Sequence, residues 1–186
     1  MRYSATHKQE TRERLLESSR AIAKKEGFDA SGVDSLMSAI GLSGGAFYNH
    51  FASKDDLFAA LVAREIENSA SMLGGDASAG VEEVNSRVRS YLSSAHALHP
   101  ETGCMLPSLG AEIARSAPEV RASVERSLRK LKSTWSKRLD GDEDGAWAAI
   151  AQCVGAILLS RIVESERTRR EILAANRRSI ADRLSP

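Results

Sequence analysis

The sequence is poor in aromatic residues, in proline and in net charge, and each shortage narrows what the protein can be. Phe, Trp and Tyr make up 5% of the 186 residues and only four residues are proline, whereas Ala, Leu, Ser, Arg and Glu are abundant. This composition, together with the lack of any strand pattern, favours an all-α protein. The formal net charge is only +1, so the global basic footprint of a nucleic-acid-binding protein is missing. Any DNA binding must therefore depend on local geometry.

Cysteine is scarce as well, and no stretch predicts export or membrane insertion. The two cysteines, Cys104 and Cys153, are far apart and fit neither a disulfide framework nor a metal-ligand spacing. We therefore expect reduced thiols in a cytoplasmic protein, with no metal or other cofactor. The polar, charged N-terminus predicts no signal peptide. The most apolar stretch, 146–159, is interrupted by Gln152 and is too short to span a bilayer, so a buried core helix and no membrane partner are expected.

The stretch from Ser31 to Lys54 predicts two short helices around a tight turn. Gly41 is expected to end the first helix, 33–40, because glycine takes the left-handed C-terminal conformation at little cost. The second helix is predicted at 44–50. Two short helices joined by a turn that contains Gly form the helix-turn-helix pattern.

Side-chain oxygens are spaced to cap these helices and the next one. Ser31 and Asp34 have the spacing of a capping box for the first helix, with Asp in place of the usual Glu or Gln. Ser43 precedes the second helix, and Ser53 precedes a long helix that is predicted to reach residue 73. That helix is long enough to connect an N-terminal unit to the rest of the chain.

The second short helix has a composition suited to contact with a polyanion. Small residues at its start would let the helix N-terminus approach phosphate, which backbone N–H groups and the helix dipole favour. Asn49 can pair with adenine, and Tyr48 and His50 can reach phosphate oxygens. No acidic residue occurs from Ser35 to Lys54, so nothing is expected to repel a polyanion. A solvated helical hairpin within a bundle is the alternative.

Helical periodicity continues through the rest of the chain, and about nine helices are expected in all. The clearest break, and the best candidate for a linker, is the stretch 74–80. The predicted helices cover 6–26 (starting at 6 or 8), 33–40, 44–50, 54–73, 78–98, 104–115, 118–139, 143–164 and 166–183.

Several motifs at fixed spacing make this pattern specific. A Gly-Phe pair at 27–28, the turn residue Gly41, a Phe-Tyr-x-His-Phe run at 47–51 and Ser-Lys-x-x-Leu at 53–57 occur in that order. Across residues 11–61 the chain resembles the TetR family of bacterial transcriptional repressors. The segments 103–104, 109–114 and 171–175 also resemble one branch of that family, which is informative about the fold and weak about the ligand.

The resemblance implies two domains with different functions. Residues 1–54 would be the helix-turn-helix DNA-binding domain, and residues 55–186 a ligand-binding and dimerisation domain entered by a connector helix at about 54–73. A homodimer would bind a palindromic double-stranded DNA operator, with recognition helices in major grooves about 34–36 Å apart. By matched position, the expected DNA contacts are Ser31, Ser43, Gly44, Gly45, Tyr48, Asn49, His50 and Lys54.

One position departs from the family pattern. Many members have Lys, Arg or Thr-Arg just after the position of Ser43, where this chain has Gly44. Each missing phosphate contact lowers the salt dependence of binding by about one unit of slope. We therefore expect modest operator affinity unless an N-terminal arm compensates. The basic residues of that arm are Arg2, His7, Lys8 and Arg12.

The resemblance also implies a small-molecule effector and a dimer interface. An effector that binds better when the two DNA-binding units are splayed would weaken operator binding reciprocally. The few charged residues at inward positions favour an unidentified, largely apolar effector. The expected lining residues, for each of which ordinary core packing is the alternative, are Tyr91, Met105, Leu109, Trp135 and Trp147. The dimer interface is expected on the last two helices, at Val154, Gly155, Leu158, Ile162 and Ile172.

Cys104 supports an alternative mode of regulation. It follows Gly103 at a predicted helix N-terminus, where the dipole would stabilise a thiolate, and His96 and His99 are near in sequence. It could thus sense oxidants or electrophiles, whereas the ordinary alternative is a buried, inert cysteine. An enzyme is not expected, because no third orienting group, metal cluster or nucleotide loop accompanies these residues. A helical enzyme or a helical interaction module remains the remote alternative.

Overall fold

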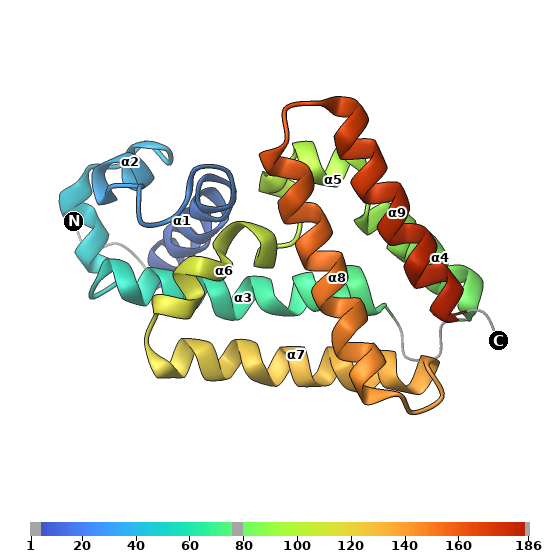
Figure 1. Ribbon diagram of the computed structural model, residues 1–186. Coiled ribbons are helices and arrows are strands. Elements are labelled where there is room, and N and C mark those ends of the chain that lie inside the picture. Colours follow the sequence, from blue (N-terminus) through green and yellow to red (C-terminus); the bar gives the residue numbers. More distant parts are fainter. Residues whose placement is uncertain (1–4, 76–79, 185–186) are drawn as a thin grey trace.

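The computed structural model describes residues 5–75 and 80–184, and all regular structure in these ranges is helical (Figure 1). The predicted all-α fold is therefore confirmed. The described ranges contain nine α-helices and two short 3-10 helices, η1 and η2. Their bounds are α1 (Ala5–Glu26), α2 (Val33–Ser38), η1 (Gly44–Asn49), α3 (Lys54–Gly74), α4 (Val81–Tyr91), α5 (Ser94–Leu98), η2 (Pro100–Thr102), α6 (Leu106–Arg115), α7 (Pro118–Arg138), α8 (Glu143–Ile162) and α9 (Glu166–Leu184).

Two glycines make the turns that shape the N-terminal unit. Gly27 follows α1 with φ +87°, and Gly41 follows α2 with φ +77°. Both lie in the left-handed region, where a Cβ atom is unfavourable, so glycine is the residue that suits these turns. Both turns lie where the sequence predicts helix ends. The second short helix is a 3-10 helix rather than an α-helix, and a dipole argument carries less weight for six residues of this kind.

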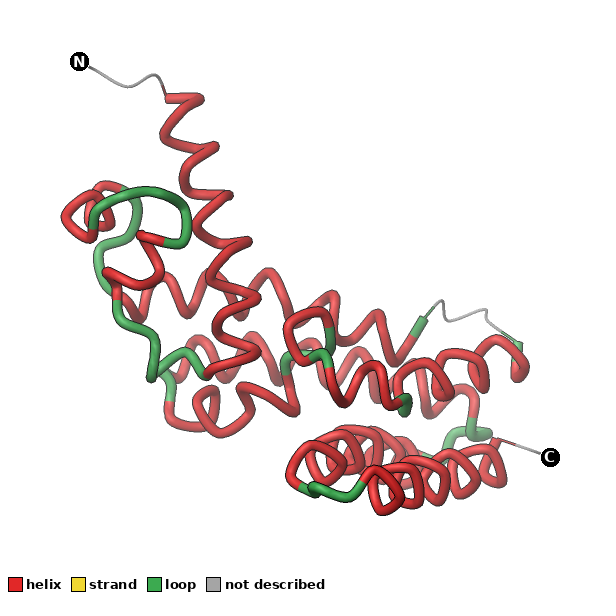
Figure 2. Tube along the Cα trace, turned by 90° about the horizontal axis from the view of Figure 1, so that it is seen from above, coloured by secondary structure: helices red, strands yellow, loops and turns green. Residues whose placement is uncertain are grey.

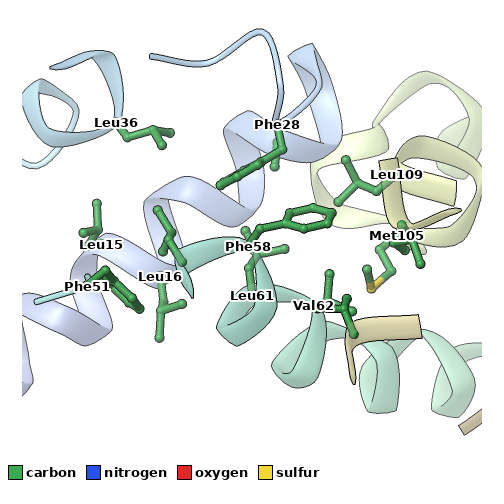
Figure 3. Close-up of a cluster of buried hydrophobic side chains, with 14 of the residues drawn as sticks. Leu15, Leu16, Phe28, Leu36, Phe51, Phe58, Leu61, Val62, Met105 and Leu109 are labelled. Atoms are coloured by element: carbon green, nitrogen blue, oxygen red, sulfur yellow. The ribbon is translucent and has the colours of Figure 1, made fainter. Parts of the chain in front are cut away.

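The hydrophobic core of the N-terminal unit continues into the C-terminal part. Phe28 and Phe58 lie between the side chains of α1 and those of α6 (Figure 3), and their ring centroids are 4.8 Å apart. Met105 and Leu109 are fully buried and belong to the same cluster as Leu15 and Leu36. The unit that contains the helix-turn-helix is therefore packed directly against α6.

A second cluster joins the remaining helices. Helices α3 and α7 pack along each other, and α8 and α9 form an antiparallel pair that lies across them (Figures 1 and 2). Trp135 is the largest fully buried side chain, and Tyr91, Cys104 and Cys153 lie in the same cluster. Two of the five predicted effector residues, Tyr91 and Trp135, lie in this second core.

Several helix boundaries differ from the prediction, and three of them concern the regions discussed below. The predicted helix 78–98, whose first two residues lie outside the described ranges, is broken after Tyr91. The break occurs because the hydroxyl of Ser93 accepts a hydrogen bond from the His96 N–H (3.2 Å) and starts the separate helix α5. Helix α2 ends at Ser38 instead of residue 40. Helix α6 begins at Leu106, two residues after the predicted start at Cys104.

Helix α8 is longer than the apolar stretch from which it was predicted. It has 20 residues and is, by length and composition alone, the one described helix that could cross a bilayer. The stretch 146–159 is only part of this helix, so the finding does not contradict the expectation that the stretch itself is too short to span a bilayer. One side is core, as predicted, since Ala146, Ile150 and Ile157 are buried. The other side is exposed and still apolar.

Candidate nucleic-acid interface

The η1 segment presents polar side chains on a fixed aromatic base, which is formed by the buried rings of Phe47 and Phe51. Phe47 is fully buried and Phe51 nearly so, with ring centroids 5.9 Å apart, as the sequence predicts for two core residues. Tyr48 is 67% exposed although its ring contacts that of Phe47 edge-on. The residues of this segment that are exposed in the chain are Ser43, Gly45, Tyr48 and Asn49, while Gly44 and His50 are half-buried.

Three of the predicted roles next to this segment need correction. Ser31 is buried and its hydroxyl donates to the carbonyl of Gly27 (2.9 Å), so it neither caps α2 nor faces outward to bind phosphate. The N-cap of α2 is Gly32, which has no side chain to contribute. Ser43 is the N-cap of η1 but its hydroxyl makes no capping bond. The prediction for Ser53 is confirmed, because its hydroxyl accepts from the Asp56 N–H (3.1 Å).

The side chain of Lys54 is held in place by contacts within the protein. Its ammonium group donates to the carbonyl of Asp29 (3.0 Å) and lies 4.8 Å from the ring centroid of Phe28. These contacts fix the start of α3 against the turn between α1 and α2. A Lys side chain has three donors, so Lys54 keeps donor capacity for a further anion.

The sequence stretch 35–54 contains no acidic residue, but an acidic residue from just outside the stretch lies against it in the structure. Asp34 is exposed and its carboxylate lies against Gly44, so closely that a Cβ atom added at Gly44 would overlap Oδ1. A larger side chain at position 44 would require the exposed side chain of Asp34 to move. A negative charge therefore lies at the start of η1.

The N-terminal half of α1 brings positive charge to the other end of η1. Arg12 stacks on the ring of Phe51, with its guanidinium carbon 4.6 Å from the centroid. Burial, and then the positive charges of Lys8 and His7, lower the pKa of His50 below its usual value. The ring of His50 is therefore neutral at pH 7, and the charge at this end belongs to α1. Arg2, a further predicted arm residue, lies outside the described residues.

The five predicted effector residues do not form one site. Tyr91 and Trp135 lie in the second core, whereas Met105 and Leu109 lie in the first. Trp147 is 39% exposed, so its predicted inward position is wrong. It lies on the outer side of α8. The sequence did not predict this, because a helix that is apolar on all sides gives no signal about which side faces the core.

The second core contains two polar atoms that lack protein partners. Neither the phenol oxygen of Tyr91 nor the indole nitrogen of Trp135 finds a hydrogen-bond partner among the described residues, and both side chains are buried. The ring of Tyr91 contacts that of His96 edge-on, with centroids 4.5 Å apart. Unpartnered buried polar groups are uncommon in proteins, so each of these two side chains keeps unused hydrogen-bonding capacity.

The geometry does not support a reactive thiol at Cys104. The residue lies before α6 rather than at its first turn, and its side chain is buried. Burial raises the pKa of the Cys104 thiol, and the opposing effect of neighbouring hydroxyl and backbone groups is smaller. Burial likewise raises the pKa of Cys153 to about 12. Both thiols are protonated at pH 7, which is the opposite of the predicted thiolate.

The exposed side of α8 forms a continuous apolar stripe. Its residues recur every three or four positions and therefore lie on one face. Leu158 and Ile162 are 47% and 68% exposed, unusually high values for large apolar side chains in a helix of this kind. Val154, Gly155 and Ile172 of the predicted interface are half-buried. The stripe consists of Trp147, Ala151, Val154, Leu158 and Ile162.

Sequence reasoning missed three buried or half-buried charged residues, Lys24, Glu65 and Glu112. Lys24 lies eight residues after Leu16, and Glu65 lies four after Leu61, so each falls on the apolar side of its helix. A charged residue at an inward position is the signal that could have found them. Lys24 and Glu65 form a buried ion pair of 2.9 Å.

Comparisons with known proteins agree with this geometry. Residues 15–61 match the family described as bacterial regulatory proteins, tetR family. The HTH-type transcriptional repressor Rv1474c of Mycobacterium tuberculosis is 35% identical over 78 residues, and the match covers 42% of this chain and 42% of that relative. The chain thus spans less than half the length of this curated relative.

Solved structures resemble the whole chain. A TetR-family transcriptional regulator from Cytophaga hutchinsonii superimposes with a TM-score of 0.74 at 20% identity, covering 98% of both chains. The reduced form of NemR from E. coli gives a TM-score of 0.71 at 19% identity and covers 93% of this chain and 97% of its own. At such low identity these structures establish the shared fold.

Proposed function

Since this chain belongs to the tetR family of bacterial regulatory proteins, we propose that it is a repressor that binds operator DNA and leaves it when a small molecule binds the C-terminal helices. The observation that carries the proposal is the η1 segment. It exposes Tyr48 and Asn49 on a buried aromatic base, with basic residues of α1 beside it. Such a segment can enter a major groove while its base stays fixed in the core. The protein would act in the cytoplasm.

We propose that the operator-binding form is a homodimer joined through α8 and α9. The apolar stripe on α8 supports this, because large exposed apolar patches mark interaction surfaces. Gly155 lies next to Val154 of the stripe and would allow two helices to approach closely. Two copies of α8 and α9 would then form a four-helix interface, which places one η1 segment at each end of the dimer for the two halves of a palindrome.

The effector is proposed to be largely apolar with at least one hydrogen-bond acceptor. The phenol of Tyr91 can donate or accept a hydrogen bond, and the indole of Trp135 can only donate. Each unpartnered buried group costs about 1–3 kcal/mol, which an acceptor oxygen on the effector would recover. We do not propose thiol sensing, because the Cys104 thiol is buried and protonated.

Operator binding is expected to be sequence-specific, of modest affinity and only weakly sensitive to salt. Gly44 removes one phosphate contact and Asp34 adds a nearby negative charge, so few phosphates are neutralised. Gel shifts with DNA that flanks the gene itself should show a retarded band. The log–log salt slope should be shallower than about −5, the value for a protein that makes roughly six phosphate contacts. No retardation by any fragment, with a folded dimer in hand, would contradict the proposal.

Replacing Asp34 by Asn is expected to tighten DNA binding about threefold at low salt. The change keeps the volume of the side chain but removes a negative charge at the edge of the interface. The gain should shrink towards high salt, because exposed charges are screened. Fluorescence anisotropy with labelled DNA at several salt concentrations measures it. Glu125→Gln, an equivalent change on the exposed side of α7, is the control and should have no effect.

A further inference from the structure

A carboxylate of the C-terminal part holds the turn between α1 and α2. The two oxygens of Glu112, on α6, accept hydrogen bonds from the N–H of Phe28 at 3.0 and 3.1 Å, and one of them also accepts from the N–H of Asp29 at 3.3 Å. These amides belong to the turn made by Gly27, beyond the end of α1. Charge-assisted bonds of this kind are stronger than neutral ones. Helix α6 therefore holds the backbone of the N-terminal unit directly.

A second polar contact lies at the other end of the same interface. The ammonium group of Lys24, on α1, lies 2.9 Å from Oε2 of Glu65 on α3 and donates to the carbonyl of Gly103 at 2.9 Å. Both side chains are almost completely buried. Gly103 belongs to the loop that enters α6. One buried cation thus ties together α1, the connector α3 and that loop.

The loop at Gly103 is in turn tied to the second core. The N–H of Cys104 donates to Nε2 of His96 (2.9 Å), so Nδ1 carries the proton and donates to the carbonyl of Tyr91 (2.6 Å). A Cβ atom at Gly103 would overlap the ring of His96, so the loop and the ring fit closely. A continuous set of hydrogen bonds therefore leads from Tyr91, which has an unpartnered phenol, to Lys24 on α1.

We propose that Glu112 and Lys24 are the positioning residues that couple the effector region to the DNA-binding unit. The inference rests on the proposed function and adds how its two sites communicate. An effector that displaces Tyr91 shifts His96 and the loop at Gly103, and a hydrogen bond weakens steeply with distance and angle. When these bonds break, the N-terminal unit loses its fixed orientation. Two unfixed units bind the two half-sites of an operator more weakly, because binding must then order them.

The first experiment removes the carboxylate of Glu112. Glu112→Ala is expected to speed hydrogen exchange of the amides of Phe28 and Asp29 about tenfold and to weaken operator binding about tenfold, with the N-terminal unit still folded. Glu112→Gln keeps an acceptor oxygen and should recover most of both effects. Arg115→Ala is the matched control on α6. Its ion pair with Asp29 is exposed, so its loss should change affinity less than about twofold.

The second experiment removes the Lys24 contact without leaving a buried charge. The double variant Lys24→Met with Glu65→Leu should remain a folded dimer and bind the operator about tenfold more weakly than the wild type. The operator affinity of the wild type, and its amide hydrogen exchange around the Glu112 and Lys24 contacts, are measured in parallel. If the wild type binds no DNA, the proposed function fails and the exchange data still test the Glu112 contact. Unchanged exchange in Glu112→Ala, or unchanged affinity in both variants alongside a wild type that binds, overturns the inference.

Discussion

Replacing Leu158 and Ile162 by Glu is expected to convert the protein into a folded monomer that no longer binds its operator detectably. Both side chains are exposed on the outer face of α8, so the substitutions leave the core of the single chain intact. Two copies of the stripe would instead bring four carboxylates into an apolar interface, where charge without a partner is strongly unfavourable.

The loss of affinity should be large because the two half-sites act together. Linking two binding modules raises affinity by about 10²–10⁴ over a single module, and a monomer forfeits that gain. Analytical ultracentrifugation measures the oligomeric state, and anisotropy with the operator measures binding. Ala122→Glu, which adds one carboxylate at an exposed position of α7, should leave both unchanged. A double variant that stays dimeric would place the interface elsewhere.

Replacing Lys24 alone by Met is expected to cost about 3–5 kcal/mol of unfolding free energy, because Glu65 is left as an unpaired buried charge. For a chain of this length each kcal/mol lowers the midpoint of thermal unfolding by about 2–4 °C, so a fall of roughly 10 °C should be observed. Arg20 lies 3.7 Å from Glu65 and compensates only in part. Wild type and variant are compared at one protein concentration, since dimers melt at a concentration-dependent temperature.

The double variant Lys24→Met with Glu65→Leu removes the ion pair without leaving an unpaired charge in the core. Apolar residues of similar volume can replace a buried ion pair with little loss, so most of the stability should return. Operator affinity should not return with it, because the bond from Lys24 to Gly103 is still missing. Full recovery of both properties would mean that the pair only fills space. A single variant as stable as the wild type would mean that Glu65 finds another partner.

The sequence predicted the turns and the buried aromatic residues of the helix-turn-helix because these signals are local. Gly41 marks a turn through its own backbone preference, and Phe47 and Phe51 mark the core side of one short segment through their spacing. Ser53 caps the helix that begins immediately after it. Each of these inferences needs only residues within about one helical turn, where geometry is nearly fixed.

Two of the failed predictions concern residues whose role depends on a distant segment, whereas Ser31 failed for a local reason. Ser31 has the spacing of a cap, yet its hydroxyl donates to the carbonyl of Gly27, four residues earlier. Cys104 adjoins a helix, yet packing within the second core buries its thiol and raises its pKa. Trp147 occurs on a helix that is apolar on every side, and periodicity does not say which side finds a neighbour.

By itself the sequence determined the all-α fold, the turns at Gly27 and Gly41, and the aromatic base of the η1 segment. Only the tertiary structure decided that Asp34 faces Gly44, that Lys24 pairs with Glu65, and that Glu112 holds the N–H of Phe28. The last two contacts join residues 41 and 84 positions apart. The physical reason is that helix formation depends on neighbouring residues, whereas buried charges depend on where whole helices meet, which no short stretch of sequence specifies.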